Sequence, residues 1–265
     1  MVHRDLSPDD PRLDPYRHVA DSAWLRARAI FVAEGRLVVA RLIALQRYDI
    51  LSVAVNQAAH DALAGPLSAL DRDVYVCGDR TLSGMAGVDF HRGCLALVRR
   101  PGPIPPDSLN DAARLVALEG VGNPDNVGGL FRTAAALGAG GILLDRTSGD
   151  PFYRKAIRTS MGATLRLPFA RLDDWLADLQ AFRARGFRIV ALTPDPDALP
   201  LDTYVHDEHA CPPMILLLGS EGAGLQPGTL TRADARVRIP IDPSMDSLNV
   251  VVAAGIALDR LRQRP

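Results

Sequence analysis

This 265-residue sequence predicts an α/β protein with a mostly parallel sheet, preceded by a second, smaller α/β unit. Beyond residue 113, apolar runs of four or five residues alternate with helical segments, a pattern typical of strands buried on both faces of a parallel sheet. Before it, four prolines fall within residues 101–106. Because proline favours a stiff, extended chain, residues 101–112 are predicted to be a linker.

The first unit is predicted to occupy residues 21–100. A helix, the segment 31–35 and a second helix through residue 45 are expected, followed by short buried strands at 50–55, 74–77 and 94–98. Residues 1–20, rich in Asp, Pro and Arg, are expected to lie loosely over the surface or to fray.

The second unit is predicted to occupy residues 113–265. Strands are expected at 115–118, 141–144, 165–169, 188–192, 214–218 and 236–239. Helices are expected at 128–137, 156–161, 175–185 and 248–262.

The composition is that of a globular protein, with 48% hydrophobic residues, 23% charged residues and a net charge of −1. No apolar run approaches the ~18 residues of a membrane span, and the first ten residues lack the apolar core of a signal peptide. Three separated cysteines leave one unpaired in any disulfide scheme, so a reduced cytoplasm is expected. His206–His209 resembles metal ligands but stands alone in a polar stretch, and no metal is expected.

Three polar, glycine-containing clusters lie where an apolar strand gives way to a loop. They span residues 119–132, 219–225 and 239–250. Ligand sites in open α/β sheets lie at the carboxyl ends of the strands, so the three clusters predict one shared pocket.

Each cluster taken alone also has a structural interpretation. Asn126 can be a helix N-cap with Arg132 on the surface, and the glycines at 219–224 can form a turn. The last cluster can begin a core helix, or a helix held between a ligand and a second subunit. A dinucleotide loop is disfavoured because Asp125 stands where the third glycine of that motif belongs.

In combination the clusters are specific. The order Asn-x-x-Asn-x-Gly-x-x-x-Arg at 123–132, Leu-Gly-x-Glu-Gly-x-Gly-Leu at 218–225 and Ile-Pro-Ile…Ser-Leu-Asn-Val at 239–250 resembles the SpoU (TrmH-like) branch of the SPOUT RNA methyltransferases. The resemblance covers residues 113–262. The leading unit, with its 31–35 and 93–98 segments, is similar to the ribosomal-protein-like RNA-binding domain of that family.

The resemblance implies a catalytic domain with a trefoil knot, S-adenosylmethionine as cofactor, and methylation of a ribose 2′-hydroxyl in RNA. Ribosomal RNA is expected because an RNA-binding unit precedes the catalytic domain, with transfer RNA as the alternative. Family members are usually homodimers, which agrees with the apolar start of the helix at 248–262.

Carried over by position, the catalytic residues are Asn126, Arg132, Glu221, Ser247 and Asn249. The residues expected to line the cofactor are Leu192, Thr193, Gly219, Ile239 and Leu248. The family often assigns the arginine as a base. Since a guanidinium has a pKa above ~12, we favour Arg132 as a clamp on the target's phosphate and a stabiliser of the developing alkoxide.

Contact with RNA is also expected at residues 150–163, where the family has a recurrent Ser-x-Gly-Ala. The expected RNA-binding residues are Arg154, Lys155, Arg158 and Ser160, beside the aromatic Phe152 and Tyr153. One departure from the family is Pro243, where glycine is common. Because proline excludes a positive φ, the loop before Ser247 is expected to take another path.

Two other classes of function remain open from the sequence. A non-catalytic RNA-binding or ribosome assembly factor could keep this fold, although the intact Asn126, Arg132, Glu221 and Asn249 argue against loss of activity. A nucleotide-binding oxidoreductase is disfavoured by Asp125.

Overall fold

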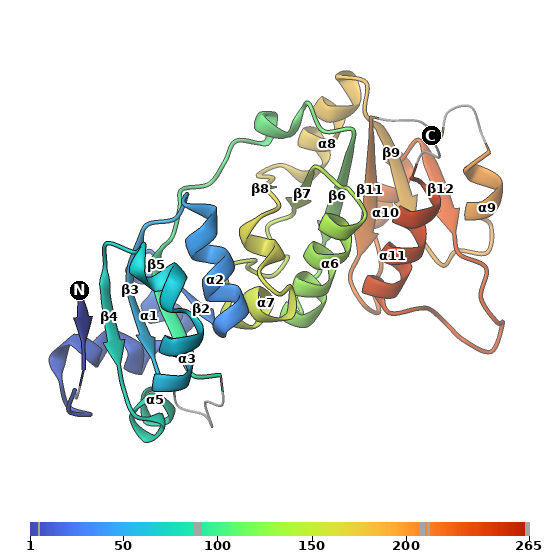
Figure 1. Cartoon of the computed structure of the whole chain (residues 1–265). Helices are drawn as coiled ribbons and strands as arrows, with labels where there is room; N and C mark the ends of the chain where they lie inside the picture. The colour runs from blue at the N-terminus through green and yellow to red at the C-terminus, as the bar shows by residue number, and fades with distance from the viewer. Residues whose placement is uncertain (5, 87–91, 207–209, 211–212, 263–265) are drawn as a thin grey trace. The chain divides into compact units, whose positions relative to one another are not determined.

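The computed structural model describes residues 1–4, 6–86, 92–206, 210 and 213–262 (Figure 1). The chain forms two compact units. The first contains Met1–Gly102 together with Phe152–Leu165, and the second contains Pro103–Pro151 and Arg166–Pro265. The stretch 152–165, which the sequence places in the second unit, therefore packs with the first. Each unit is described by itself.

The first unit is built on a five-stranded sheet of order β1-β4-β3-β5-β2. β1, β4 and β3 are parallel, whereas β5 is antiparallel to β3 and β2. The strands are β1 (Val2–His3), β2 (Ile30–Glu34), β3 (Ile50–Val55), β4 (Asp73–Val76) and β5 (Cys94–Arg99). The helices are η1 (Pro11–His18), α1 (Ser22–Ala27), α2 (Arg36–Leu45), α3 (Gln57–Ala62), α4 (Ala64–Ser68), α5 (Asp79–Ala86), α7 (Arg154–Thr159) and η3 (Ala163–Leu165).

The expectation that residues 1–20 lie loosely over the surface is wrong. Val2 pairs with Val74 at the edge of the sheet, and η1 follows as a 3-10 helix. Leu13 and Tyr16 are fully buried in the core of the unit, and the Tyr16 hydroxyl hydrogen-bonds to Ser52 Oγ at 2.8 Å. Their spacing of three residues places both on one face of a 3-10 helix, which explains the packing.

The second unit is built on a seven-stranded sheet of order β10-β12-β9-β11-β6-β7-β8, and every neighbouring pair in it is parallel. The strands are β6 (Arg114–Glu119), β7 (Gly141–Leu144), β8 (Phe169–Arg171), β9 (Arg188–Leu192), β10 (Leu199–Pro200), β11 (Met214–Gly219) and β12 (Ala235–Arg238). The helices are η2 (Pro106–Leu109), α6 (Pro124–Ala136), α8 (Trp175–Ala184), α9 (Leu201–Tyr204), α10 (Pro227–Arg232) and α11 (Val250–Arg260). The predicted parallel α/β sheet is confirmed.

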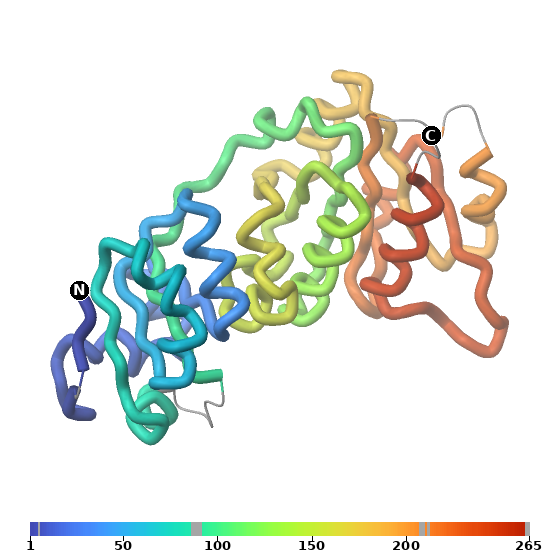
Figure 2. Tube along the Cα trace, viewed as in Figure 1, coloured from blue at the N-terminus to red at the C-terminus, as the bar shows by residue number. Residues whose placement is uncertain are grey.

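Both faces of this sheet are covered. Leu115 and Ala117 point to the face where Phe182 of α8 completes a core cluster. α6 and α11 lie together over the sheet (Figure 1). The tube in Figure 2 shows that a long loop, residues 239–249, joins β12 to the start of α11.

The predicted strand at 165–169 is wrong. Leu165 ends the 3-10 turn η3, and β8 begins only at Phe169. Pro168 lacks the N–H that a strand interior needs, although its carbonyl accepts a hydrogen bond from Ile142 N at 3.0 Å. The predicted linker at 101–112 is not extended throughout. It contains the 3-10 helix η2, whose Leu109 is buried in the core of the second unit.

Candidate active site

The three sequence clusters lie at the carboxyl ends of parallel strands in the second unit. β6 ends at Glu119 beside Gly219, where β11 ends. The loop 239–249 leaves β12, which pairs with β9, the other neighbour of β11. The sheet therefore brings the clusters to one edge, as the strand order of an open α/β sheet predicts.

The turn after β11 is a tight backbone hairpin. Ser220 N donates to Gly224 O at 3.3 Å, and Gly224 N donates to Ser220 O at 3.0 Å. A Cβ added to Gly219 would lie 2.2 Å from the carbonyl carbon of Gly224, so only glycine allows this closure. The hairpin presents the backbone of residues 219–224 to the neighbouring cavity.

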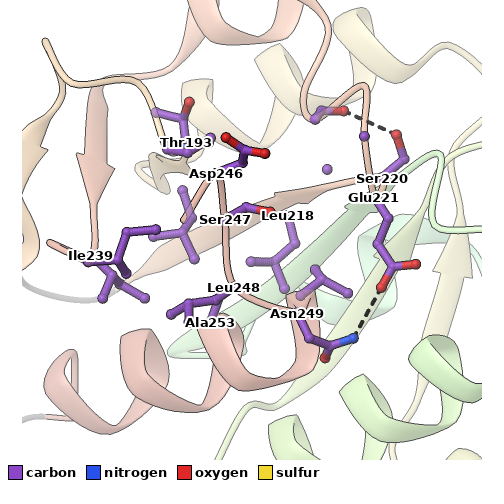
Figure 3. A pocket seen from close by; sticks show the side chains of 17 residues that line it. Thr193, Leu218, Ser220, Glu221, Ile239, Asp246, Ser247, Leu248, Asn249 and Ala253 are labelled. Atoms are coloured by element: carbon purple, nitrogen blue, oxygen red, sulfur yellow. Dashed lines mark hydrogen bonds between the residues drawn. The ribbon is translucent and has the colours of Figure 1, made fainter. Parts of the chain in front are cut away.

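A cavity of about 630 Å³ opens at this edge (Figure 3). All five residues expected to line the cofactor do line it, namely Leu192, Thr193, Gly219, Ile239 and Leu248. Three of the expected catalytic residues, Glu221, Ser247 and Asn249, also lie on its wall. The wall is mainly apolar side chains and glycine-rich backbone, with two acidic residues, Glu221 and Asp246.

Asn249 connects the clusters through hydrogen bonds. Its Nδ2 donates to Glu221 Oε1 at 3.1 Å and to Asn126 Oδ1 at 3.2 Å. Its Oδ1 accepts from Val251 N at 2.9 Å, which makes Asn249 the N-cap of α11. One amide thus fixes the helix start and holds a side chain from each of the other two clusters.

Asn126 is not the N-cap of α6. That position belongs to Asn123, whose side chain accepts from Asp125 N at 2.9 Å while Pro124 occupies the first helical position. Asn126 lies inside the helix, is 6% exposed and points its carbonyl oxygen to Asn249. A capping role therefore does not account for this residue.

Arg132 lies six residues after Asn126 on α6, with an exposed side chain. It makes no hydrogen bond or ion pair with the described residues and does not line the cavity. Its guanidinium is therefore free to meet a ligand that approaches from solvent.

Two buried carboxylates that the sequence analysis missed hold the site loops. Glu119 accepts from Thr229 Oγ1 at 2.7 Å and from Gln226 N at 2.9 Å, which anchors the start of α10 beyond the glycine hairpin. Asp145 accepts from Ser148 N at 2.7 Å and from Thr147 Oγ1. A carboxylate at the end of a buried strand was the available signal for Glu119.

The pKa of Asp145 is lowered. Burial raises it, but hydrogen bonds from Ser148, Thr147 and the backbone of Gly120 to the ionised form outweigh that effect. Ser148 Oγ also accepts from Val121 N at 3.2 Å, so the charge of Asp145 helps to fix the loop that leads into α6.

Pro243 occupies a turn that suits it. Met245 N donates to Asp242 O at 3.0 Å, and Ser244 N and Oγ donate to Asp242 Oδ1 at 2.9 and 2.6 Å. Proline is thus at the second position of a β-turn, where its fixed φ is favourable. The hydrogen bonds from Ser244 also lower the pKa of Asp242.

The expected RNA-binding residues lie in the first unit and differ in their surroundings. Ser160 is 1% exposed and donates to Ile157 O at 2.8 Å, so its expected contact with RNA is not supported. Phe152 is likewise buried, stacked on Phe31 with ring centroids 4.8 Å apart. Arg154 and Arg158 form ion pairs with Glu34, and Lys155 is half-buried.

The part of the chain that the structure describes contains no group of three metal-ligating side chains. Residues 207–209 of the rejected His206–His209 ligand set lie outside it. Cys77 and Cys94 are buried free thiols, and Cys211 lies outside the described residues. None of the helices in the described ranges is long and apolar enough to cross a membrane.

A parallel α/β sheet whose strand ends enclose a cavity of this size, beside a hydrogen-bonded cluster of polar side chains, is typical of enzymes that bind a nucleotide-type cofactor. The sequence matches the SpoU rRNA Methylase family over residues 113–259. The chain belongs to this family.

Three relatives illustrate the relationship. An uncharacterized tRNA/rRNA methyltransferase of Mycobacterium bovis is 36% identical over 94% of this chain and 88% of its own length. The 23S rRNA (guanosine-2′-O-)-methyltransferase RlmB of Acinetobacter baylyi is 34% identical over 69% of this chain and 76% of its own. The crystal structure of an AdoMet-bound rRNA methyltransferase from Sinorhizobium meliloti is 27% identical, with a TM-score of 0.80 over 98% of this chain and 97% of that one.

Proposed function

We propose that this enzyme transfers a methyl group from S-adenosylmethionine to a ribose 2′-hydroxyl of ribosomal RNA. The observation that carries the proposal is the hydrogen-bonded set Asn126, Asn249 and Glu221 beside the cavity at the strand ends. The family and the 23S rRNA ribose methyltransferase among its relatives support the choice of reaction and RNA.

The cavity suits S-adenosylmethionine. Leu192, Ile239 and Leu248 offer apolar contact for an adenine ring, and the glycine hairpin offers backbone groups for polar atoms. None of the lining residues within the described chain is Lys or Arg, whereas Glu221 and Asp246 are acidic. Such a wall favours a cationic ligand and disfavours a pyrophosphate, which argues against a dinucleotide.

Bound in this cavity, S-adenosylmethionine supplies a sulfonium methyl that is already a good electrophile. The protein therefore has to position the nucleophile and raise its reactivity. At the cavity wall the Glu221 carboxylate offers acceptor oxygens and accepts a hydrogen bond from the amide of Asn249, which also donates to Asn126 on α6. We assign to these three residues, with Ser247, the orientation of the ribose hydroxyl.

Arg132 is assigned to the RNA side of the reaction. It lies on the same helix as Asn126, outside the cavity lining and without a protein partner among the described residues. A guanidinium pairs well with phosphate and stabilises an alkoxide as charge develops. Arg132 therefore clamps the phosphate of the target nucleotide, and the hydroxyl proton passes to solvent water.

A homodimer is part of the proposal. Val252 and Ile256 are one helical turn apart on α11 and are 51% and 37% exposed. Apolar side chains at this spacing on a helix that begins beside the cavity favour burial against a second copy. We further place the enzyme in the cytoplasm, where rRNA is made and where the buried thiols of Cys77 and Cys94 stay reduced.

The test is to incubate the protein with labelled S-adenosylmethionine and RNA from a host that lacks it, and then to map alkali-resistant linkages. A methylated 2′-oxygen cannot attack its own phosphate, so one new resistant linkage in rRNA is expected. Incorporation of label into RNA without a new alkali-resistant linkage would mean that a base is methylated. Absence of transfer with intact cofactor binding would favour a non-catalytic RNA-binding factor.

A further inference from the structure

A second cavity, of about 340 Å³, lies in the first unit beside the start of α2. Its wall includes Glu34, Gly35 and Arg36 from the junction of β2 and α2, together with Arg92 and Arg158. It is separate from the cofactor cavity, since all its lining residues belong to the first unit.

Positive charge is in excess around this cavity. Glu34 is 5% exposed, and three guanidiniums surround its carboxylate. Arg92 Nε and Arg158 Nη1 lie 3.5 and 3.8 Å from Oε1. Arg154 Nε lies 3.5 Å from Oε2. The three guanidiniums and the Glu34 carboxylate together carry a net charge of +2, and Arg36 adds a further positive side chain to the cavity wall.

None of these ion pairs is a short hydrogen bond. Charge-assisted N–H···O bonds have lengths of about 2.7–2.9 Å, and all three distances are longer. Glu34 Oε2 and Arg154 Nη1 are buried without a hydrogen-bond partner among the described residues. Because Arg92 and Arg158 lie 3.5 and 3.8 Å from Glu34, its carboxylate leaves guanidinium donors at the cavity wall available to a further acceptor.

The start of α2 adds backbone N–H donors, which also favour a negatively charged ligand. The helix has ten residues, and its N-cap is Gly35, with a φ of 94° and no side chain to accept from the first backbone N–H groups. These groups have no partner inside the helix and lie at the positive end of its dipole. A helix start next to unsaturated guanidiniums is a favourable place for an anion.

We propose that this cavity binds a phosphate group, and that in the cell the phosphate is a phosphodiester of the RNA substrate. Arg92 and Arg158, which line the cavity, and the backbone at the start of α2 hold the anion. Arg154 does not line the cavity and supports the cluster through Glu34. The RNA source rests on the proposed function, whereas the phosphate site rests on the first unit alone.

The first experiment measures the thermal unfolding temperature in phosphate and in chloride at matched ionic strength. Phosphate should raise the unfolding temperature of the wild-type protein by about 2–4 °C when it is well above its Kd. Arg158→Gln should remove this increase. The matched control is Arg26→Gln, an exposed arginine on α1, which should keep it. Equal effects of phosphate and chloride on the wild type would overturn the site.

Glu34→Gln separates a ligand site from a structural ion-pair cluster. Loss of the carboxylate raises the net charge of the cluster to +3, so phosphate should raise the unfolding temperature more in this variant than in the wild type. A purely structural cluster predicts a lower unfolding temperature that phosphate does not restore, and that result would contradict the proposal.

The second experiment measures binding of single-stranded RNA as a function of salt, without methyl transfer. Each phosphate contact contributes about 0.7 to the slope of log K against log salt, so Arg158→Gln should reduce the slope by about that amount. S-adenosylmethionine affinity should not change. An unchanged slope, with the phosphate effect still dependent on Arg158, would exclude RNA as the source of the phosphate. Because both readouts are equilibrium binding, failure of the proposed reaction would not alter them.

Discussion

Gly129 of α6 packs directly against Val251 of α11. A Cβ added to Gly129 would lie 2.8 Å from Val251 Cγ2 and 3.1 Å from Cγ1. The two helices carry Asn126 near the start of α6 and Asn249 as the cap of α11, and the side chains of these residues meet at 3.2 Å. The absence of a side chain at Gly129 therefore sets the helix separation that allows the polar cluster to form.

Gly129→Ala should push the two helices apart. The clash with the stiff Val251 side chain should cost about 1–3 kcal/mol of unfolding free energy, partly offset by the ~1 kcal/mol that alanine gains over glycine in a helix. The rate of methyl transfer should fall by more than the loss of unfolding free energy alone would cause, because Asn249 moves away from Asn126. Urea unfolding and single-turnover rates measure the two effects.

Gly255→Ala is the matched control, since a Cβ there meets Thr133 Cγ2 at an ordinary 3.6 Å. It should preserve both stability and transfer. Val251→Ala in the Gly129→Ala background should restore transfer, and failure of this rescue would mean that helix separation does not govern the site.

Asn249→Asp should disable the site and preserve the helix start. An aspartate still accepts from Val251 N as an N-cap, but it loses the amide donor and adds a negative charge beside Glu221. Transfer should fall by about 100-fold because the polar cluster loses its geometry. Circular dichroism should show intact helix, whereas Asn249→Ala should also lose about 1 kcal/mol of stability with the cap. If Asn249→Asp and the wild type transferred methyl groups at equal rates, the amide donor of Asn249 would not be required for the reaction.

The apolar periodicity of the sequence was sufficient to predict the parallel sheet. Because each of the three clusters follows a predicted strand, their meeting at the carboxyl ends of the strands could also be predicted. The N-cap at Asn123 was also readable in principle, since Pro124 marks the first turn of a helix. The burial of residues 13 and 16 was not, because the excess of Asp, Pro and Arg around them concealed a 3-10 face.

The ion pairs of Arg154 and Arg158 could not be predicted from the local sequence pattern. A run of bases beside aromatics favours a solvated, RNA-facing segment, but their counter-ion Glu34 is about 120 residues earlier in the chain. Ion pairs between distant segments depend on tertiary packing, which no spacing rule encodes. The same holds for the hydrogen-bond partners of Glu119, since Gln226 and Thr229 follow it by more than a hundred residues.

Arg132→Ala should separate cofactor binding from chemistry. Because Arg132 does not line the cofactor cavity, S-adenosylmethionine affinity measured by calorimetry should stay within error of the wild type. Single-turnover transfer should fall by about 10²–10³-fold through loss of the phosphate clamp and of charge stabilisation. A collapse of cofactor affinity would place Arg132 on the cofactor side instead.

Val252→Asp should yield a monomer. The substitution places a charge in the middle of the exposed apolar stripe on α11, where a second copy is proposed to pack. Sedimentation velocity should show half the mass of the wild type. Leu199→Asp, which alters an exposed apolar residue on β10, serves as the control and should leave the mass unchanged. A wild-type monomer would refute the proposed dimer.

Asp145→Asn should remove a pH-dependent part of the stability. The folded-state pKa of Asp145 is lowered from 3.8, so its contribution is fully present above the unfolded-state pKa and is lost as pH falls through the folded-state pKa. At pH 7 the variant should be about 1–3 kcal/mol less stable in urea unfolding, because the charged acceptor of the Ser148 and Thr147 hydrogen bonds is lost. The difference between wild type and variant should shrink as pH decreases below about 3.8. A difference that is constant between pH 7 and pH 3 would show that the hydrogen bonds to Asp145 do not depend on its charge.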